Sequence, residues 1–284
     1  MSNYVEKKFR RLCEKYGVDI DKIYNDGFNF EQAKVIVQAK DDVFISTMYD
    51  TKYDADQMFQ IYLSHIENDN LTCLVNETFT AEQMMEIRLG YFYFLCNKQY
   101  VNAKYTAEQL KQIRIGLENG IDVSGYADVN KTPKDMEYMR RELMKSITID
   151  WSDFIDCTQN MAIELHKLFM DGVNIGVFCD EYDLSVDYIK ELGELLDKNP
   201  DLNYYLPLYD TLDQLEEIDV WLQHRLDPDL YLKGQYNSDQ MRQIRLGLEN
   251  CVDITKYNGI RNGITPVYTA EEMKKLRINL IKEY

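Results

Sequence analysis

Residues 105–128 read YTAEQLKQIRIGLENGIDVSGYAD, and residues 236–258 read nearly the same, as YNSDQMRQIRLGLENCVDITKYN. The shared frame recurs along the chain at intervals of about 26 residues, a spacing that is typical of repeat arrays. Its copies begin near Tyr4, Phe28, Tyr53, Phe79, Tyr105, Lys131, Cys157, Leu184, Asp210, Tyr236 and Tyr268. The sequence therefore predicts about eleven copies of one structural unit.

The apolar positions of each copy predict a helix. With the first residue counted as zero, position 8 is aliphatic or Met in every copy, and position 5 is apolar. In the cleanest copy, positions 5, 8 and 12 are Leu110, Ile113 and Leu117, whose spacing places them on one face of a helix. An aromatic residue recurs at position 21. Each copy is thus predicted to be an amphipathic helix followed by a short return segment.

Both ends of this helix carry capping signals. At the N-terminal end, a hydroxyl residue stands where an N-cap belongs, and a Gln three residues later completes a capping box in two of three clear cases. The pairs are Thr80 with Gln83, Thr106 with Gln109, and Ser238 with Met241. At the other end, Gly120 occupies the position of a left-handed C-cap. The return segment could be a 3₁₀ turn, a short second helix or an extended strand.

A helix with one apolar face cannot bury that face alone, and stacking on neighbouring copies is the natural solution. We therefore expect an all-α fold, a helical repeat array of the α-solenoid type, with little or no sheet. A single domain is expected over residues 1–284, with regular units at 53–130 and 236–284 and degenerate acidic units at 131–235. The insertion at 258–267 is rich in turn-forming residues and is predicted to be a loop.

Composition limits the classes of partner. The chain has 284 residues with 32 basic and 49 acidic side chains, for a net charge of −17. That balance argues against direct nucleic-acid binding, which depends on Lys and Arg. The six cysteines form no CxxC pair, and the N-terminal residues lack the apolar core of a signal peptide. We expect a cytoplasmic protein with reduced thiols, no association with membranes, and a partner with a basic surface.

The copies at 79, 105, 236 and 268 also carry a resemblance. Their AEQMMEIRLG, AEQLKQIRIGLENGIDVSGYAD and SDQMRQIRLGLENCVDITKYN stretches resemble a short repeat found in uncharacterised proteins of gut Firmicutes and of their phages and mobile elements. That repeat has the form aromatic-x-x-x-Gln-Met-x-x-Ile-Arg-x-Gly-Leu-Glu-x-Gly-x-Asp-Val-Ser-x-Tyr-Ala. The resemblance implies a setting in a mobile element, and it implies no reaction.

An arginine recurs at position 9 of five copies. The five are Arg88, Arg114, Arg140, Arg245 and Arg277. They could form a ladder that binds phosphates, or each could be a structural stitch whose guanidinium bonds an acid or a carbonyl of the adjacent unit. We favour the stitch, because other copies lack the arginine and the chain is acidic. The aspartates at position 17, which are Asp122, Asp227 and Asp253, are suggested as its partners.

Acidic residues concentrate between residues 178 and 230. They could form a solvated outer face, or a docking strip for a basic groove on another protein. The carboxylates proposed for this acidic strip are Asp180, Glu181, Asp183, Asp187, Glu191, Glu194, Asp210, Asp213, Glu216, Glu217 and Asp219.

The copy at 79 departs from its siblings by reading YFYFLC at residues 91–96. Phe92, Tyr93 and Phe94 exceed what the apolar stripe requires. They could pack against a neighbouring unit, or form an aromatic patch that anchors a partner.

Signals for catalysis are weak. The sequence lacks the common phosphate-binding, zinc-protease and serine-nucleophile motifs, and its three histidines lie in different copies. We therefore expect a non-catalytic protein without cofactor or metal that binds a basic macromolecule. In its specific form, this hypothesis is a phage or mobile-element inhibitor of a host nucleic-acid-binding defence protein, of the anti-CRISPR or anti-restriction kind. The alternatives are an adaptor or assembly scaffold that uses the aromatic patch, and an enzyme with an unrecognised site.

Overall fold

A computed structural model describes residues 3–41, 45–68, 74–75, 78–91, 98–154, 157–178, 184–209, 211–233 and 235–282. Helices dominate this part of the chain, and its β structure is limited to one hairpin of two-residue strands, so the all-α prediction is confirmed. Among the described helices, none is both long enough and apolar enough to cross a membrane.

The chain divides into two compact units, which are described separately. Unit 1 combines residues 1–62 with residues 213–284, and unit 2 comprises residues 63–212. The division does not test the expected single domain, which stays a prediction.

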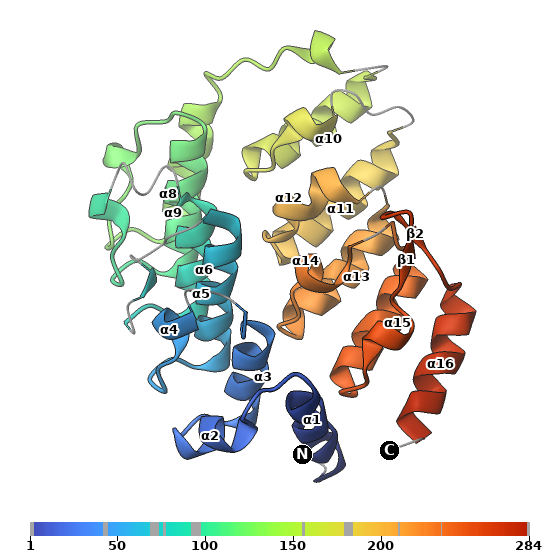
Figure 1. The fold of residues 1–284 in the computed structure, drawn as a ribbon. Helices are drawn as coiled ribbons and strands as arrows, with labels where there is room; N and C mark the ends of the chain where they lie inside the picture. The colour runs from blue at the N-terminus through green and yellow to red at the C-terminus, as the bar shows by residue number, and fades with distance from the viewer. Residues whose placement is uncertain are drawn as a thin grey trace. The chain divides into compact units, whose positions relative to one another are not determined.

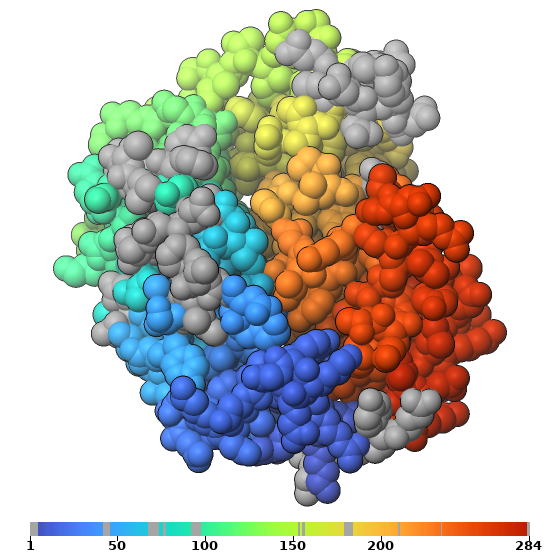
Figure 2. Space-filling view, in the orientation of Figure 1, coloured from blue at the N-terminus to red at the C-terminus, as the bar shows by residue number. Residues whose placement is uncertain are grey.

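Unit 1 holds helices from both ends of the chain (Figure 1). Its elements are α1 (Asn3–Lys15), α2 (Ile20–Asn25), α3 (Phe30–Gln38), α4 (Ile45–Met48), the first eight residues of α5 (Ala55–Asn68), α13 (Leu212–Gln223), α14 (Pro228–Tyr231), α15 (Ser238–Glu249), the 3₁₀ helix η7 (Ile254–Lys256), β1 (Ile260–Arg261), β2 (Thr265–Pro266) and α16 (Ala270–Lys282). In the space-filling view, α15, the hairpin and α16 form one continuous face of this unit (Figure 2).

Unit 2 alternates longer α-helices with short 3₁₀ helices. Its elements are α6 (Ala81–Leu89), η2 (Lys98–Tyr100), α8 (Ala107–Glu118), η3 (Val123–Gly125), α9 (Pro133–Met144), η4 (Trp151–Asp153), α10 (Gln159–Met170), η5 (Ile175–Phe178), α11 (Val186–Lys198), α12 (Leu202–Tyr205) and η6 (Leu206–Leu208). Consecutive helices pack on each other, α6 on α8, α8 on α9, and α10 on α11.

The helix α8 shows why the cleanest copy folds as it does. Thr106 accepts a hydrogen bond from the Gln109 backbone, and the Gln109 side chain accepts one from the Thr106 backbone, so the predicted capping box is present. Gly120 follows the helix with φ +69°, in the left-handed region. In the copy at 236 the predicted cap was wrong by one residue: the N-cap of α15 is Asn237, boxed with Gln240. Both residues sit at the same frame positions as Thr106 and Gln109.

The return segment takes two of the forms that the sequence left open: it is a 3₁₀ helix in the copies at 79, 105, 131, 157 and 236, and a short α-helix in others, such as α2, α4 and α14. Asp122 caps η3 by accepting from the Ser124 backbone, and Asp253 caps η7 by accepting from the Thr255 backbone. The aromatic residue that follows then folds back onto its own helix. Tyr126 donates to the carbonyl of Gln112, 3.0 Å away.

A glycine in α8 and another in α15 each leave room for the tyrosine that folds back onto that helix. A Cβ atom on Gly116 would lie 2.0 Å from the Tyr126 hydroxyl, and one on Gly247 would lie 1.7 Å from the Tyr257 hydroxyl. The Gly of the recurring Gly-Leu-Glu stretch is therefore required by the close approach of an aromatic ring, while its own backbone is ordinary helix.

The predicted apolar columns form the core. Ile113, Ile218 and Ile244 at position 8 are fully buried, and so are Leu110 and Met241 at position 5. The insertion at 258–267 differs from the predicted loop, because Ile260 pairs with Pro266 and Arg261 with Thr265 in an antiparallel hairpin. Asn262 and Gly263 have positive φ and make its turn.

Candidate functional site

The recurring arginines lie inside the protein, and Arg88 is the most enclosed of them. Its side chain is 1% exposed. It donates to both oxygens of Glu67, at 2.7 and 2.5 Å, and its other terminal nitrogen donates to Asp201 at 2.6 Å. Burial alone would lower the pKa of this guanidinium, but Asp201 and Glu67 raise it above its usual value. Arg88 therefore ties together segments that are far apart in sequence within unit 2.

Arg114 occupies the same position in the next copy and is 6% exposed. Its Nε donates to Glu86 of the preceding copy at 2.8 Å, and its Nη1 donates to both oxygens of Glu118 at 3.0 Å. Burial would lower the pKa of Arg114, but Glu86 and Glu118 raise it. Burial raises the pKa of Glu118, although Arg114 opposes that shift. Two carboxylates, Glu86 and Glu118, thus share the single positive charge of Arg114.

Arg140 has neutral partners instead. Its Nε donates to the side-chain oxygen of Gln112 at 2.9 Å, and its Nη1 donates to the carbonyl of Met170 at 2.5 Å. Burial and the nearby Arg141 lower the pKa of Arg140, and the weaker opposing effects of Asp171 and Glu137 do not offset that shift.

One rule relates these contacts. In four of the five arginines at position 9, the Nε bonds the side chain at position 7 of the preceding copy, as Arg114 bonds Glu86 and Arg140 bonds Gln112. Arg245 likewise bonds Glu217 at 2.5 Å, and Arg277 bonds Gln243 at 3.2 Å. The geometry is that of a stitch between adjacent copies. The aspartates suggested as partners take other roles: Asp122 and Asp253 cap 3₁₀ helices, and Asp227 accepts from Tyr62.

A second inter-copy contact was missed by the sequence reasoning. The Gln at position 4 uses its oxygen in the capping box and its nitrogen to bond the first backbone carbonyl of the next copy. Gln109 donates to Lys131 at 2.6 Å, Gln32 to Tyr53 at 2.6 Å, and Gln240 to Tyr268 at 2.8 Å. The recurrence of Gln at position 4 could have indicated this contact, but the capping box alone was enough to explain a Gln there.

The acidic strip is only partly available to a partner. Asp187, Glu191 and Glu194 are exposed on α11, as are Asp213 and Glu216 on α13. Two proposed members are buried, each 3% exposed, and so do not belong to a docking surface. Glu217 holds Arg245 and Arg242, and Asp219 accepts from Gln223. The remaining proposed members, Asp180, Glu181, Asp183 and Asp210, lie outside the described residues.

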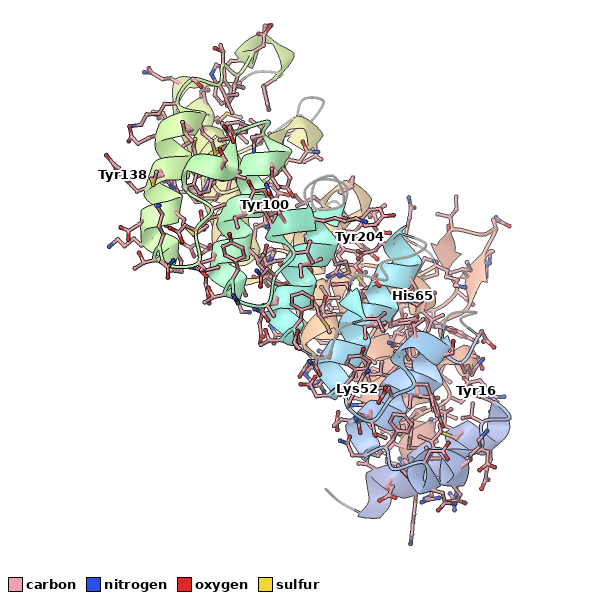
Figure 3. All side chains as sticks on the ribbon, turned by 90° about the vertical axis from the view of Figure 1, so that its left-hand side faces the viewer. Tyr16, Lys52, His65, Tyr100, Tyr138 and Tyr204 are labelled. Atoms are coloured by element: carbon pink, nitrogen blue, oxygen red, sulfur yellow. The ribbon has the colours of Figure 1, made fainter. Side chains whose placement is uncertain are left out.

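The aromatic patch of Phe92, Tyr93 and Phe94 also lies outside the described residues. Within the described part of the chain, Tyr138 is the most exposed large apolar side chain, at 67%. It projects outward from α9 (Figure 3).

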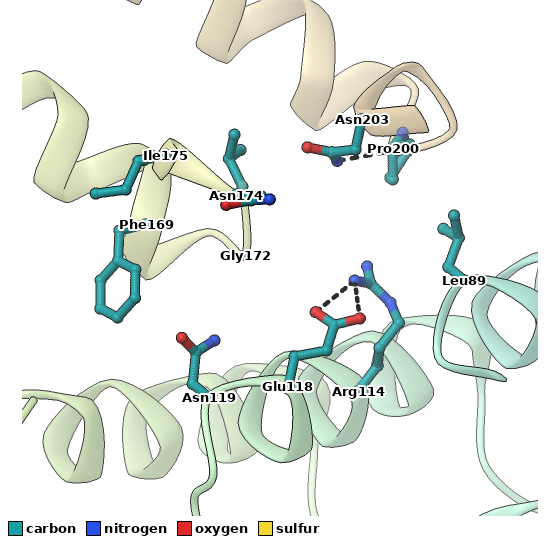
Figure 4. Close-up of a pocket in the computed structure, with 11 residues that line it drawn as sticks. Leu89, Arg114, Glu118, Asn119, Phe169, Gly172, Asn174, Ile175, Pro200 and Asn203 are labelled. Atoms are coloured by element: carbon teal, nitrogen blue, oxygen red, sulfur yellow. Dashed lines mark hydrogen bonds and ion pairs between the residues drawn. The ribbon is translucent and has the colours of Figure 1, made fainter. Parts of the chain in front are cut away.

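Unit 2 contains a pocket of about 500 Å³ (Figure 4). The Arg114–Glu118 ion pair forms one side, and Phe169, Gly172 and Asn174 form another. Its lining comprises Leu89, Arg114, Glu118, Asn119, Phe169, Gly172, Val173, Asn174, Ile175, Pro200 and Asn203. A cavity of this size is in the range that binds small ligands or short segments of a larger one.

Two polar atoms in this pocket lack partners. The Oδ1 atom of Asn203 is buried and has no hydrogen bond, while its Nδ2 donates to the Pro200 carbonyl at 3.0 Å. The Nη2 atom of Arg114 bonds none of the residues that the structure describes. The pocket thus offers one unmatched acceptor and one unmatched charged donor.

The described residues contain no group of three or more His, Cys, Asp or Glu placed to hold a metal ion. Comparison with protein-family models, with characterised proteins and with solved structures finds no match to this chain. A function can therefore be argued only from the contacts and charges of the chain itself.

Proposed function

We propose that this chain is a non-catalytic, acidic helical-repeat protein of the α-solenoid type that binds a macromolecule with a basic surface. The regular stitches from each copy to the previous one support a repeat array, because the same two frame positions meet each time. In this proposal the protein acts in the cytoplasm, and the free state of Cys13, Cys157 and Cys251 agrees with that setting.

The observation that carries the binding proposal is the distribution of charge. The buried charged residues include four bases, which are Lys8, Arg88, Arg114 and Arg140, and six acids, which are Glu86, Asp201, Glu217, Asp219, Asp227 and Asp253. Burial therefore takes up similar numbers of both signs, and most of the net charge of −17 falls on other residues. Because Asp187, Glu191 and Glu194 are exposed at helical spacing on α11, they form a compact negative face for a basic partner.

An octalysine peptide with a fluorescent label provides a defined basic probe. Fluorescence anisotropy should show binding that weakens as salt is added, because exposed charges are screened. Neutralising the face with Asp187→Asn, Glu191→Gln and Glu194→Gln should weaken binding about 3- to 150-fold, since exposed ion pairs contribute about 0.2–1 kcal/mol each.

The matched control also removes three negative charges, but from helices other than α11. Glu14→Gln, Glu142→Gln and Glu271→Gln neutralise three exposed carboxylates on three different helices. The proposal requires this control to retain most of the affinity. Equal losses in the two triple variants would show that only overall charge matters, and the α11 face would be rejected as a site.

The specific form of the proposal is an inhibitor that competes with nucleic acid for a basic groove, in a phage or mobile-element setting. Carboxylates on α11 would then occupy positions that phosphates otherwise take. Accordingly, the protein should displace a labelled DNA duplex from octalysine, and the α11 triple variant should do so less well. Retention of the DNA in the presence of saturating protein would contradict inhibition by competition.

A further inference from the structure

The pocket of unit 2 is separate in its chemistry from the acidic face, because its unmatched atoms are amide and guanidinium groups. Arg114 is one of its walls and is nine-tenths buried, yet its Nη2 atom has no acceptor among the described residues. Asn203 faces the same pocket with a buried Oδ1 atom that has no donor. Leaving the buried Asn203 oxygen without a partner costs free energy, and the Arg114 Nη2 atom is a charged donor open to the pocket, so both mark positions where a ligand atom would be stabilised.

The charges around Arg114 decide which acceptor suits its Nη2 atom. Glu86 and Glu118 both bond this guanidinium, so the three groups together are net negative when ionised. A phosphate or carboxylate ligand would add a further negative charge to a poorly solvated site, which is unfavourable. A neutral carbonyl oxygen satisfies the donor without that cost. The site therefore excludes anions and favours an uncharged acceptor.

Two asparagines of the pocket show which other hydrogen-bonding groups the ligand needs. The Asn203 oxygen needs an N–H donor, and the Asn174 amide faces it across the pocket (Figure 4). Asn174 uses its oxygen to accept from the Gly176 backbone at 3.1 Å, which leaves its NH₂ group as a donor. A neighbouring carbonyl and N–H pair is what a peptide unit presents.

The apolar residues of the lining suit the side chains of a peptide ligand. Leu89, Phe169, Val173, Ile175 and Pro200 surround the polar groups. They can cover side chains while the amides bond the backbone. We infer that the pocket of unit 2 binds a short extended segment of another polypeptide, through hydrogen bonds from Arg114 and Asn174 and to Asn203, with a neutral or basic segment preferred.

A screen with a defined library tests this site. The probe is a bead library of random heptapeptides, acetylated and amidated so that only side chains carry charge. Full-length wild-type protein should retain a set of peptides that Asn203→Leu does not retain. Asn130→Leu is the control, because Asn130 is exposed and lies outside the pocket in the same unit. It should retain the same peptides as the wild type.

Backbone recognition is then measured directly on the best peptide. N-methylation at one backbone nitrogen, or an ester in place of one amide, should reduce its affinity at least tenfold at one position of the segment, in line with a lost buried hydrogen bond. Acetyl-alanine methylamide, a single small peptide unit, should bind much more weakly than the heptapeptide. If it binds as well, the ligand is a small amide, and the assignment to a polypeptide is overturned.

Two further measurements separate loss of the pocket from loss of the acidic face. Leu89→Trp narrows the pocket from another wall and should abolish retention without altering Asn203. Octalysine binding at the α11 face should be unchanged in Asn203→Leu, so failure of the pocket and failure of the acidic face give different results. Retention of the same peptides by wild type, Asn203→Leu and Leu89→Trp would overturn the inference, as would the absence of any peptide retained by the wild type alone.

Discussion

Arg114 bonds Glu86 at 2.8 Å across 28 residues of sequence, from position 9 of one copy to position 7 of the copy before it. The pair is buried on both sides, with 6% and 4% of the side chains exposed. Its repetition at Arg140, Arg245 and Arg277 makes it a structural rule of the chain.

The first prediction concerns the energy of this stitch. Arg114→Met leaves the buried Glu86 and the half-buried Glu118 without their cation, and it should lower the free energy of unfolding by about 3–5 kcal/mol. Urea unfolding followed by circular dichroism measures the change. The control is Arg141→Met, which breaks partly exposed pairs with Glu137 and Asp171 and should cost less than about 1 kcal/mol. Equal costs at the two sites would contradict a special role for the buried stitch.

The second prediction concerns the glycine beneath Tyr126. Replacing a helical Gly by Ala ordinarily stabilises a protein, by roughly 0.5–1 kcal/mol. Gly116→Ala should instead destabilise it by about 1–3 kcal/mol, because the new Cβ would collide with the Tyr126 hydroxyl. Adding Tyr126→Phe should recover part of the loss.

Gly125→Ala serves as the comparison for that experiment, since a Cβ there meets nothing within 4 Å. Its effect on the thermal midpoint should be small. A stabilising Gly116→Ala would show that the ring moves aside without cost.

The third prediction separates the two roles of Gln109. Gln109→Glu keeps the oxygen that caps Thr106 and removes the nitrogen that bonds the carbonyl of Lys131. The variant should lose about 1–3 kcal/mol of stability, because a partly buried carbonyl loses its donor. The reverse change at the equivalent position, Glu272→Gln, should be nearly neutral, because Glu272 is exposed and its hydrogen bonds within the described part of the chain are all to Thr269. A neutral Gln109→Glu would reject the contact between copies as a source of stability.

The fourth prediction concerns pH. Burial raises the pKa of Asp227 to about 6, although the Tyr62 hydroxyl, 2.9 Å away, opposes the shift. The folded state therefore binds this proton more tightly than the unfolded state, and ionisation of Asp227 destabilises the fold above about pH 6. That penalty disappears as pH falls below the unfolded value near 4.

Asp227→Asn removes the titration and keeps an oxygen for the Asp229 backbone, which Asp227 caps. The stability of the variant relative to the wild type should be highest above pH 6 and should decline by on the order of 2 kcal/mol toward pH 4. Urea unfolding of both proteins at pH 4.5, 6 and 7.5 measures this. A difference that is independent of pH would show that the pKa of Asp227 is not raised.

The local structure of each copy could be predicted from sequence because its causes act over a few residues. The stripe of Leu110, Ile113 and Leu117 predicts the helix, and the box of Thr106 with Gln109 predicts where it begins. The left-handed Gly120 follows from the same reasoning. The return segment remained open, because a 3₁₀ turn and a short α-helix use the same residues and differ by one hydrogen bond.

The partners of charged side chains depended on tertiary structure. The sequence suggested the aspartates at position 17 as partners of the arginines, but Arg114 bonds Glu118 of its own helix and Glu86, which the packing of α6 against α8 brings within reach. Glu217 likewise is buried where it accepts hydrogen bonds from Arg245, although the sequence placed it among the surface carboxylates.

The sequence by itself thus determined the helical unit, the caps at Thr80 and Thr106, the period and the acidic balance of the chain, since each rests on neighbours in sequence or on simple composition. Only the tertiary structure decided that Arg88 meets Asp201, and that Arg114, Asn174 and Asn203 line one pocket. Those contacts depend on which helices pack against each other. The packing is determined by many weak apolar contacts between residues far apart in sequence, which leave no local sequence pattern.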